Sequence, residues 1–200
     1  MSVITNINEL DFSKKYTYAD YVKWQFDEMV ELIHGKIYRM SPAPNLEHQR
    51  VSGRLHTFIN IFLMKGKCES FAAPFDVRLP LPPKQVKENK INTVVQPDIT
   101  IVCDPEKLDS AGCKGAPDWI IEILSKGTSK KDLNEKFELY QHAGVPEYWI
   151  AHPMDGTLLI FRLDKKEKYQ SLRPQPYTSG DSISPAAFPD LKIDLTKVFS

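Results

Sequence analysis

Two acidic side chains in otherwise apolar stretches are the residues of this sequence best suited to chemistry. Asp98 lies in the run QPDITIV, and Glu122 lies in the run WIIEILS. A carboxylate among Ile and Val residues is costly unless it pairs with a cation or accepts hydrogen bonds. If the two runs form neighbouring strands, about 4.8 Å apart, the carboxylates repel each other. A bound Mg²⁺ or Mn²⁺ would remove that repulsion.

Such a cation would give the two acids a hydrolytic function. Mg²⁺ and Mn²⁺ take oxygen ligands, commonly one or two carboxylates with water and a substrate phosphate. Asp98 and Glu122 therefore suffice for one metal ion, with the main-chain carbonyl of Ile123 as a third ligand. The bound ion would lower the pKa of a water molecule and neutralise charge as a phosphodiester is hydrolysed. The alternative is structural: each acid lies at a strand end and pairs with a lysine or with backbone amides.

A polar helix face follows the second acid along the chain. Asp132, Lys136 and Tyr140 are each one helical turn apart, so they share a face that can lie over the strand ends. A phosphate at the start of this helix would meet the positive end of its dipole. Three lysines flank that start: Lys126, Lys130 and Lys131. They are either phosphate contacts or solvated surface lysines.

The hydrophobic pattern predicts the elements that position these side chains. Caps and apolar spacings of three and four predict helices at 17–30, 46–65 and 128–142. Apolar β-branched or alternating runs predict strands at 68–80, 93–103, 119–124, 148–152 and 157–163. A hairpin is expected about His34-Gly35, a loop at 80–92 and an edge strand within 185–199.

Together these elements predict one α/β domain over residues 1–200, an α+β arrangement with a central mixed sheet flanked by helices. Its strands are expected around Leu32, Val77, Ile99, Ile121 and Trp149. The aromatic residues Trp119, Tyr148 and Trp149 are expected in the core, rather than stacked on bases.

Composition narrows the classes of protein. Lys plus Arg and Asp plus Glu number 26 each, so net charge gives no reason to expect a nucleic-acid partner, and any basic surface must be local. Cys68, Cys103 and Cys113 lack CxxC spacing, which argues against a zinc site and a disulfide framework. We expect reduced, mostly buried thiols and a cytoplasmic protein. No apolar run is long enough for a secretory signal or a membrane helix.

Four segments carry a resemblance to a known family. They are QPDITIVCD, APDWIIEILSKGTSKKDLNEKFELYQHAGVPEYWIAHP, ELIHGKIYRMSPAPNLEHQRV and FPDLKIDLTKVF, which together span nearly the whole chain. The sequence resembles the Uma family of restriction-endonuclease-like proteins, a branch of the PD-(D/E)xK nuclease superfamily. The resemblance implies a restriction-endonuclease-like core and a Mg²⁺- or Mn²⁺-dependent endonuclease that cuts DNA. Nucleases of this fold often act as homodimers, because a two-fold pair addresses both strands of a duplex.

The resemblance also implies roles for single residues. Pro97-Asp98 matches the PD of the family, Glu122 matches its second acid, and Glu31 matches the acid that opens its first strand. The superfamily pattern then places a lysine two residues after the second acid, where this chain has Leu124. The resemblance implies that Lys136, from the following helix, replaces that lysine.

Other side chains are expected to support these. The resemblance implies that Asp132 and Tyr140 assist Lys136, and that His48 points toward the site, where it would contact a phosphate or Glu31. A surface or capping role for His48 is the alternative. The remaining histidines show no metal spacing and are expected to be structural: His34, His56, His142 and His152.

Two other functions stay open from the sequence. Leu124 in place of the lysine and the neutral net charge favour a nuclease-like fold that binds nucleic acid or protein without useful turnover. A third candidate is a phosphodiesterase that acts on small nucleotides.

Overall fold

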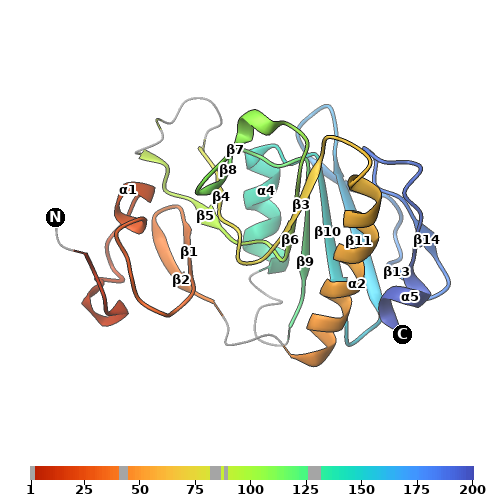
Figure 1. The fold of residues 1–200 in the computed structure, drawn as a ribbon, viewed down its shortest axis with the longest axis horizontal. Coiled ribbons are helices and arrows are strands. Elements are labelled where there is room, and N and C mark those ends of the chain that lie inside the picture. Colours follow the sequence, from red (N-terminus) through yellow and green to blue (C-terminus); the bar gives the residue numbers. More distant parts are fainter. Residues whose placement is uncertain (1–2, 41–44, 82–86, 88–89, 126–131) are drawn as a thin grey trace.

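The computed structural model describes residues 3–40, 45–81, 87, 90–125 and 132–200. Its larger sheet has seven strands (Figure 1). In spatial order these are β12 (Tyr169–Ser171), β11 (Thr157–Leu163), β10 (Glu147–His152), β9 (Trp119–Ile123), β6 (Ile99–Val102) and β3 (Glu69–Ala72), and β13 (Tyr177–Thr178) pairs with β11. Strands β9 and β10 run parallel and the other pairs run antiparallel. The sheet is therefore mixed.

A second sheet has six strands. In spatial order these are β2 (Lys36–Arg39), β1 (Val30–Ile33), β5 (Val94–Val95), β4 (Val77–Arg78), β8 (Gly112–Lys114) and β7 (Leu108–Asp109). The predicted mixed α+β class is confirmed. The five predicted strands do not share one sheet, however, because Leu32 and Val77 belong to this second sheet.

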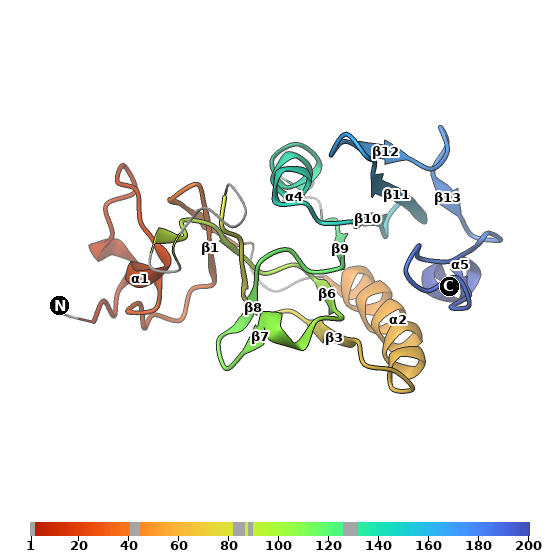
Figure 2. The same cartoon turned by 90° about the horizontal axis from the view of Figure 1, so that it is seen from above.

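Helices cover both faces of the seven-stranded sheet. The α-helices are α1 (Tyr18–Tyr21), α2 (Leu46–Leu63), α4 (Phe137–Ala143) and α5 (Leu195–Phe199). The shorter turns are η1 (Ile7–Glu9), η3 (Pro105–Lys107) and the π-helical turn η4 (Asp132–Lys136). Figure 2 shows α2 and α4 on opposite sides of β9. Among the residues described, no helix combines the length and apolar character that a membrane span requires.

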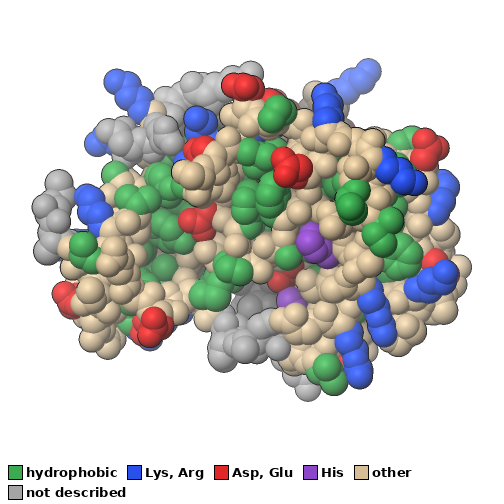
Figure 3. All heavy atoms as spheres, in the orientation of Figure 1, with side chains coloured by type: hydrophobic (Ala, Val, Ile, Leu, Met, Phe, Trp, Pro, Cys, Tyr) green, Lys and Arg blue, Asp and Glu red, His purple; other side chains and the backbone are tan. Residues whose placement is uncertain are grey.

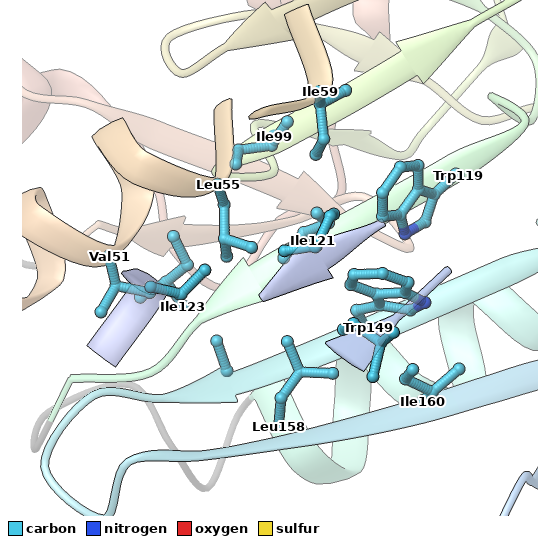
Figure 4. Packing of buried hydrophobic residues seen from close by; sticks show 14 of the residues in the cluster. Val51, Leu55, Ile59, Ile99, Trp119, Ile121, Ile123, Trp149, Leu158 and Ile160 are labelled. Atoms are coloured by element: carbon cyan, nitrogen blue, oxygen red, sulfur yellow. The ribbon is translucent and has the colours of Figure 1, made fainter. Parts of the chain in front are cut away.

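The alternation of side chains along β9 explains this layering. Residues 119, 121 and 123 point toward α2, where Val51, Leu55 and Ile59 complete a buried cluster (Figure 4). The indole rings of Trp119 and Trp149 meet edge to face there, with ring centroids 4.4 Å apart. Residues 120, 122 and 124 point the other way, toward α4 and the six-stranded sheet. Glu122 is therefore on the α4 side of β9.

Two of the crossings between the sheets divide predicted strands. The predicted strand at 93–103 is broken at Gln96-Pro97-Asp98 into β5 and β6, which lie in different sheets. The predicted strand at 68–80 is broken at 73–76 into β3 and β4. Proline has no N–H for a strand ladder, and Pro74 and Pro97 mark both breaks. These crossings bring Asp76, Gln96 and Asp98 to the junction of the sheets.

Other predicted elements are confirmed, and two more are wrong. The hairpin about His34-Gly35 forms with φ of 51° and 83°, and α2 begins after its cap Asn45. The helix expected at 17–30 ends after Tyr21, and Val30 belongs instead to β1, where it pairs with β2. The tail 185–199 closes no edge of either larger sheet. Its strand β15 (Ile193–Asp194) pairs with β14 (Ser182–Ile183), and α5 contacts α2.

The cysteines also differ from expectation. Cys68 and Cys103 form a disulfide, because the antiparallel pairing of β3 with β6 brings these two flanking residues opposite each other. Cys113 is a buried free thiol, and burial raises its pKa to about 11. The expectation of three reduced thiols is therefore wrong for this pair. It came from counting cysteines without knowing which strands would pair.

Candidate active site

Asp98 lies at the end of the β6–β9 pair, beside the strand that carries Glu122. Ile99 of β6 pairs with Ile121 of β9 in antiparallel register, and Asp98 directly precedes β6. Asp98 Oδ2 accepts a hydrogen bond of 2.7 Å from the Ile123 amide. The Asp98 side chain is 20% exposed. This carboxylate therefore lies beside the peptide that follows Glu122 and is open to solvent.

Glu122 is held by two residues of the following helical segment. Its Oε1 accepts hydrogen bonds of 2.7 Å from Lys136 Nζ and 2.7 Å from the Tyr140 hydroxyl. Lys136 closes the π-helical turn η4, and Tyr140 follows one turn later in α4. Burial, and then the charge of Glu122, raise the pKa of Tyr140 well above its ordinary value, so its hydroxyl remains a donor. The predicted helix face thus meets the second acid.

Glu31 completes the same buried group. Its Oε1 lies 3.0 Å from Lys136 Nζ and accepts a hydrogen bond of 3.0 Å from the Gln96 amide. The side chains of Glu31, Glu122 and Lys136 are 1%, 4% and 5% exposed. One ammonium therefore bridges two carboxylates from the two different sheets. A charged set of this kind is stable only when hydrogen bonds compensate its lost hydration.

His48 approaches from the other side of the sheet. It lies in the first turn of α2, and its amide donates to the side chain of the cap Asn45. Its Nε2 lies 3.1 Å from Asp98 Oδ1. The contact is thus with Asp98, whereas the sequence suggested a phosphate or Glu31. His48 Nδ1 is buried, with no hydrogen-bond partner among the described residues.

Some predicted site residues lie outside what the structure describes. These are Lys126, Lys130, Lys131 and the side chain of Asp132, whose backbone begins η4. Two residues at the junction were missed. The backbone N–H of Gln96 donates a hydrogen bond to Glu31, and its side-chain Nε2 donates one of 2.7 Å to Asp76 Oδ1. The available signal was the position of Gln96, directly before Pro97-Asp98, whereas nothing in the spacing indicated Asp76.

The donor set suits a hard divalent cation. Asp98 before β6 and Glu122 in β9 offer carboxylate oxygens, and the Ile123 carbonyl is an oxygen donor on the adjacent peptide. Among the described residues there is no group of three or more His, Cys, Asp and Glu side chains that could hold a metal ion alone. An ion held by two carboxylates and one carbonyl would keep several water ligands, as Mg²⁺ does.

Neither acid depends on a metal cation for compensation of its charge, although the sequence led us to expect a metal cation between them. In the structure Glu122 is paired with Lys136, and Asp98 with His48 and a backbone amide. Repulsion between Asp98 and Glu122 therefore does not by itself require a metal ion.

Known proteins share this fold and sequence pattern. An uncharacterised protein of Synechocystis sp. is 28% identical over 132 residues, which are 64% of this chain and 63% of that protein. The chain thus matches less than two thirds of that relative's length. A crystal structure described as a putative nuclease of DUF820, from Anabaena variabilis, superposes with a TM-score of 0.69 at 18% identity. That match covers 92% of this chain and 97% of the other, and it shows the likeness of the folds.

A family model covers the same region, including the acids and lysine described above. The model described as "Uma2: Putative restriction endonuclease" matches residues 18–196. The resemblance seen in the sequence is thereby confirmed, and this chain belongs to the Uma2 family.

Proposed function

We propose that this chain is a divalent-metal-dependent endonuclease that hydrolyses phosphodiester bonds, with DNA as its substrate. The observation that carries the proposal is the buried bridge of Lys136 between Glu31 and Glu122, with Asp98 bonded to the peptide that follows Glu122. Two carboxylates and one lysine from neighbouring elements are the groups that metal-assisted phosphodiester hydrolysis needs. Membership of a family described as restriction endonucleases supports the reaction class.

Each residue then has a defined role. Asp98, Glu122 and the Ile123 carbonyl would hold the ion, Mg²⁺ or Mn²⁺, which supplies Lewis-acid activation of water and neutralises phosphate charge. Lys136 orients the attacking water and stabilises the charge that develops on the phosphate oxygens. Tyr140 and Glu31 hold Glu122 and Lys136 in place through the contacts already described. His48 fixes the orientation of the Asp98 carboxylate.

The substrate is expected to meet local positive charge. Net charge is zero, but lysine and arginine side chains gather on the right of the molecule in Figure 3, over α2 and the C-terminal elements. Lys126, Lys130 and Lys131 are proposed as further phosphate contacts, and Asp132 as a helper of Lys136. Binding through such contacts weakens steeply as salt is added.

Cleavage of plasmid DNA in Mg²⁺ or Mn²⁺ tests the proposal. The wild type is compared with Glu122→Gln, which keeps the shape of the side chain, and with Glu138→Gln on the exposed side of α4. We expect Glu122→Gln to lose activity about 100-fold or more, Glu138→Gln to retain it, and EDTA to abolish it. An inactive wild type in both metals contradicts the proposal.

A second candidate function is a nucleic-acid or protein binding module without turnover. Leu124 at the usual lysine position favours it. DNA binding that is equal in the wild type and Glu122→Gln, with no cleavage by either, would support it. Hydrolysis of bis(p-nitrophenyl) phosphate without cleavage of DNA would instead indicate a phosphodiesterase for small nucleotides.

We further propose that the chain acts as one domain and as a homodimer, with one site for each strand of a duplex. A buried hydrophobic cluster that contains residues of both larger sheets, such as Val77 and Tyr148, supports the single domain. Sedimentation equilibrium tests the dimer, and a monomer at all concentrations would refute it.

A further inference from the structure

The junction between the sheets holds a chain of hydrogen bonds that ends at the candidate active site. Gln96 lies at its centre. The Gln96 amide donates to Glu31 Oε1, and the Gln96 side-chain Nε2 donates to Asp76 Oδ1. One residue therefore connects the acid that contacts Lys136 with a second acid, which the proposed chemistry does not use.

Asp76 is itself held from the N-terminal segment. The Tyr21 hydroxyl, at the end of α1, donates to Asp76 Oδ1 at 3.2 Å and lies 3.4 Å from Gln96 Nε2. Burial, and then the charge of Asp76, raise the pKa of Tyr21 well above its ordinary value, so the hydroxyl stays a donor. Burial also raises the pKa of Asp76. Helix α1 thus contacts the network although it gives no group to the site itself.

The backbone of Asp76 is fixed as well. Its carbonyl accepts a hydrogen bond of 2.8 Å from the Cys113 amide, where β4 meets β8. A Cβ atom added at Gly112 would lie 2.2 Å from this same carbonyl oxygen, so only glycine allows so close an approach. The backbone of Asp76 is therefore held in place, and Gln96 forms hydrogen bonds to Asp76 through its side chain and to Glu31 through its backbone N–H.

We propose that Tyr21, Asp76 and Gln96 form a positioning network that holds Glu31 against Lys136, and that the N-terminal segment thereby controls the geometry of the active site. Glu31 Oε1 contacts Lys136 Nζ and also accepts the hydrogen bond from the Gln96 backbone N–H. A shift of Gln96 would therefore move the carboxylate oxygen that Lys136 contacts. The same Nζ contacts Glu122, so the displacement reaches this acid as well. The catalytic consequence rests on the proposed nuclease function, whereas the network itself does not.

Three matched variants test the network in the full chain. Tyr21→Phe removes only the hydroxyl and keeps the ring contacts with Tyr18 and Trp24. Asp76→Asn removes the charge but keeps one acceptor oxygen. Tyr16→Phe is the control, because its hydroxyl bonds to the backbone N–H and carbonyl of Asp11 and, within the described residues, to no member of the network. For each, hydrogen exchange of the Gln96 amide, the Tm, and kcat and KM on DNA are measured.

The network predicts that the backbone amide hydrogen of Gln96 exchanges about tenfold faster or more in Tyr21→Phe and Asp76→Asn than in the wild type, and at the wild-type rate in Tyr16→Phe. It also predicts about a tenfold lower kcat with little change in KM, because the loss concerns the positioned groups and not substrate contacts. A purely structural role would lower the Tm and leave kcat unchanged in the folded fraction.

The outcomes separate the two proposals. The network is overturned if the Gln96 amide exchanges at the wild-type rate in both variants, or if its exchange is accelerated equally in Tyr16→Phe. Faster exchange with unchanged kcat overturns its control of the site. Faster exchange in Tyr21→Phe and Asp76→Asn, together with a wild type that cleaves no nucleic acid, supports the network and counts against the nuclease.

Discussion

Replacing Lys136 by methionine should destabilise the protein strongly and make it respond more to divalent cations. Its Nζ lies 2.7 Å from Glu122 and 3.0 Å from Glu31, and all three side chains are at most 5% exposed. Methionine fills a similar volume but carries no charge. The variant therefore keeps two buried carboxylates without the ammonium that bridges them.

The magnitude follows from that burial. Removing one partner of a buried ion pair costs about 3–5 kcal/mol. For a chain of 150–250 residues, 1 kcal/mol lowers the Tm by roughly 2–4 °C, so we expect a fall of about 6–20 °C. A cation at 100 times its Kd would return about 2.7 kcal/mol. Mn²⁺ should thus raise the Tm of Lys136→Met more than that of the wild type.

Thermal unfolding with and without Mn²⁺ measures both effects. Lys197→Met, an exposed lysine of α5, is the control and should change stability by no more than about 0.5 kcal/mol. Adding Glu31→Gln to Lys136→Met should recover part of the loss, because one buried charge is then removed. A Tm for Lys136→Met within about 2 °C of the wild type would refute the bridge, since the expected fall is at least threefold larger.

Three other predictions concern the rest of the fold. Reducing the disulfide between β3 and β6, which spans 35 residues, should lower stability by about 4 kcal/mol, seen as a lower Tm together with alkylation of two more thiols. Burial raises the pKa of Glu147 above 4.5, so the folded state binds a proton more readily than the unfolded state, and the contribution of Glu147 to stability falls as pH rises through the raised pKa. Glu147→Gln should therefore gain stability relative to the wild type from pH 4.5 toward neutrality. A difference in Tm that does not change with pH would contradict this. Gly112→Ala should cost more than Gly115→Ala by chemical denaturation, because both have positive φ but only at Gly112 does a Cβ meet the Asp76 carbonyl; equal costs would show that the close approach relaxes freely.

Local pattern was enough to predict the main elements and the central contacts of the site. The alternation around Glu122 and the one-turn spacing of Lys136 and Tyr140 are properties of single elements, and both side chains do contact Glu122. The structural alternative considered for the acids also describes part of what is seen. Asp98 accepts from a backbone amide and Glu122 pairs with a lysine, as that alternative requires, and the metal site stays a proposal.

The remaining features depend on which strands pair, and short-range pattern does not contain that information. Continuous apolar runs at 68–80 and 93–103 predicted single strands, whereas each run is divided between two sheets. That division brings Asp76 beside Gln96, and Cys68 beside Cys103. The disulfide also weakens the prediction of a cytoplasmic location, because such bonds persist mainly in oxidising compartments.

The charges of the site favour metal-dependent chemistry over metal-free binding of nucleic acid. Three carboxylates, of Asp98, Glu122 and Glu31, meet one lysine and one histidine among the described contacts. A partner rich in phosphate would be repelled by Asp98, the most exposed of the three acids, unless a cation lay between them. A binding module without metal would gain by replacing these acids with neutral residues. In the proposed nuclease, a divalent ion held by Asp98 would join this acid to the phosphate of the substrate during turnover.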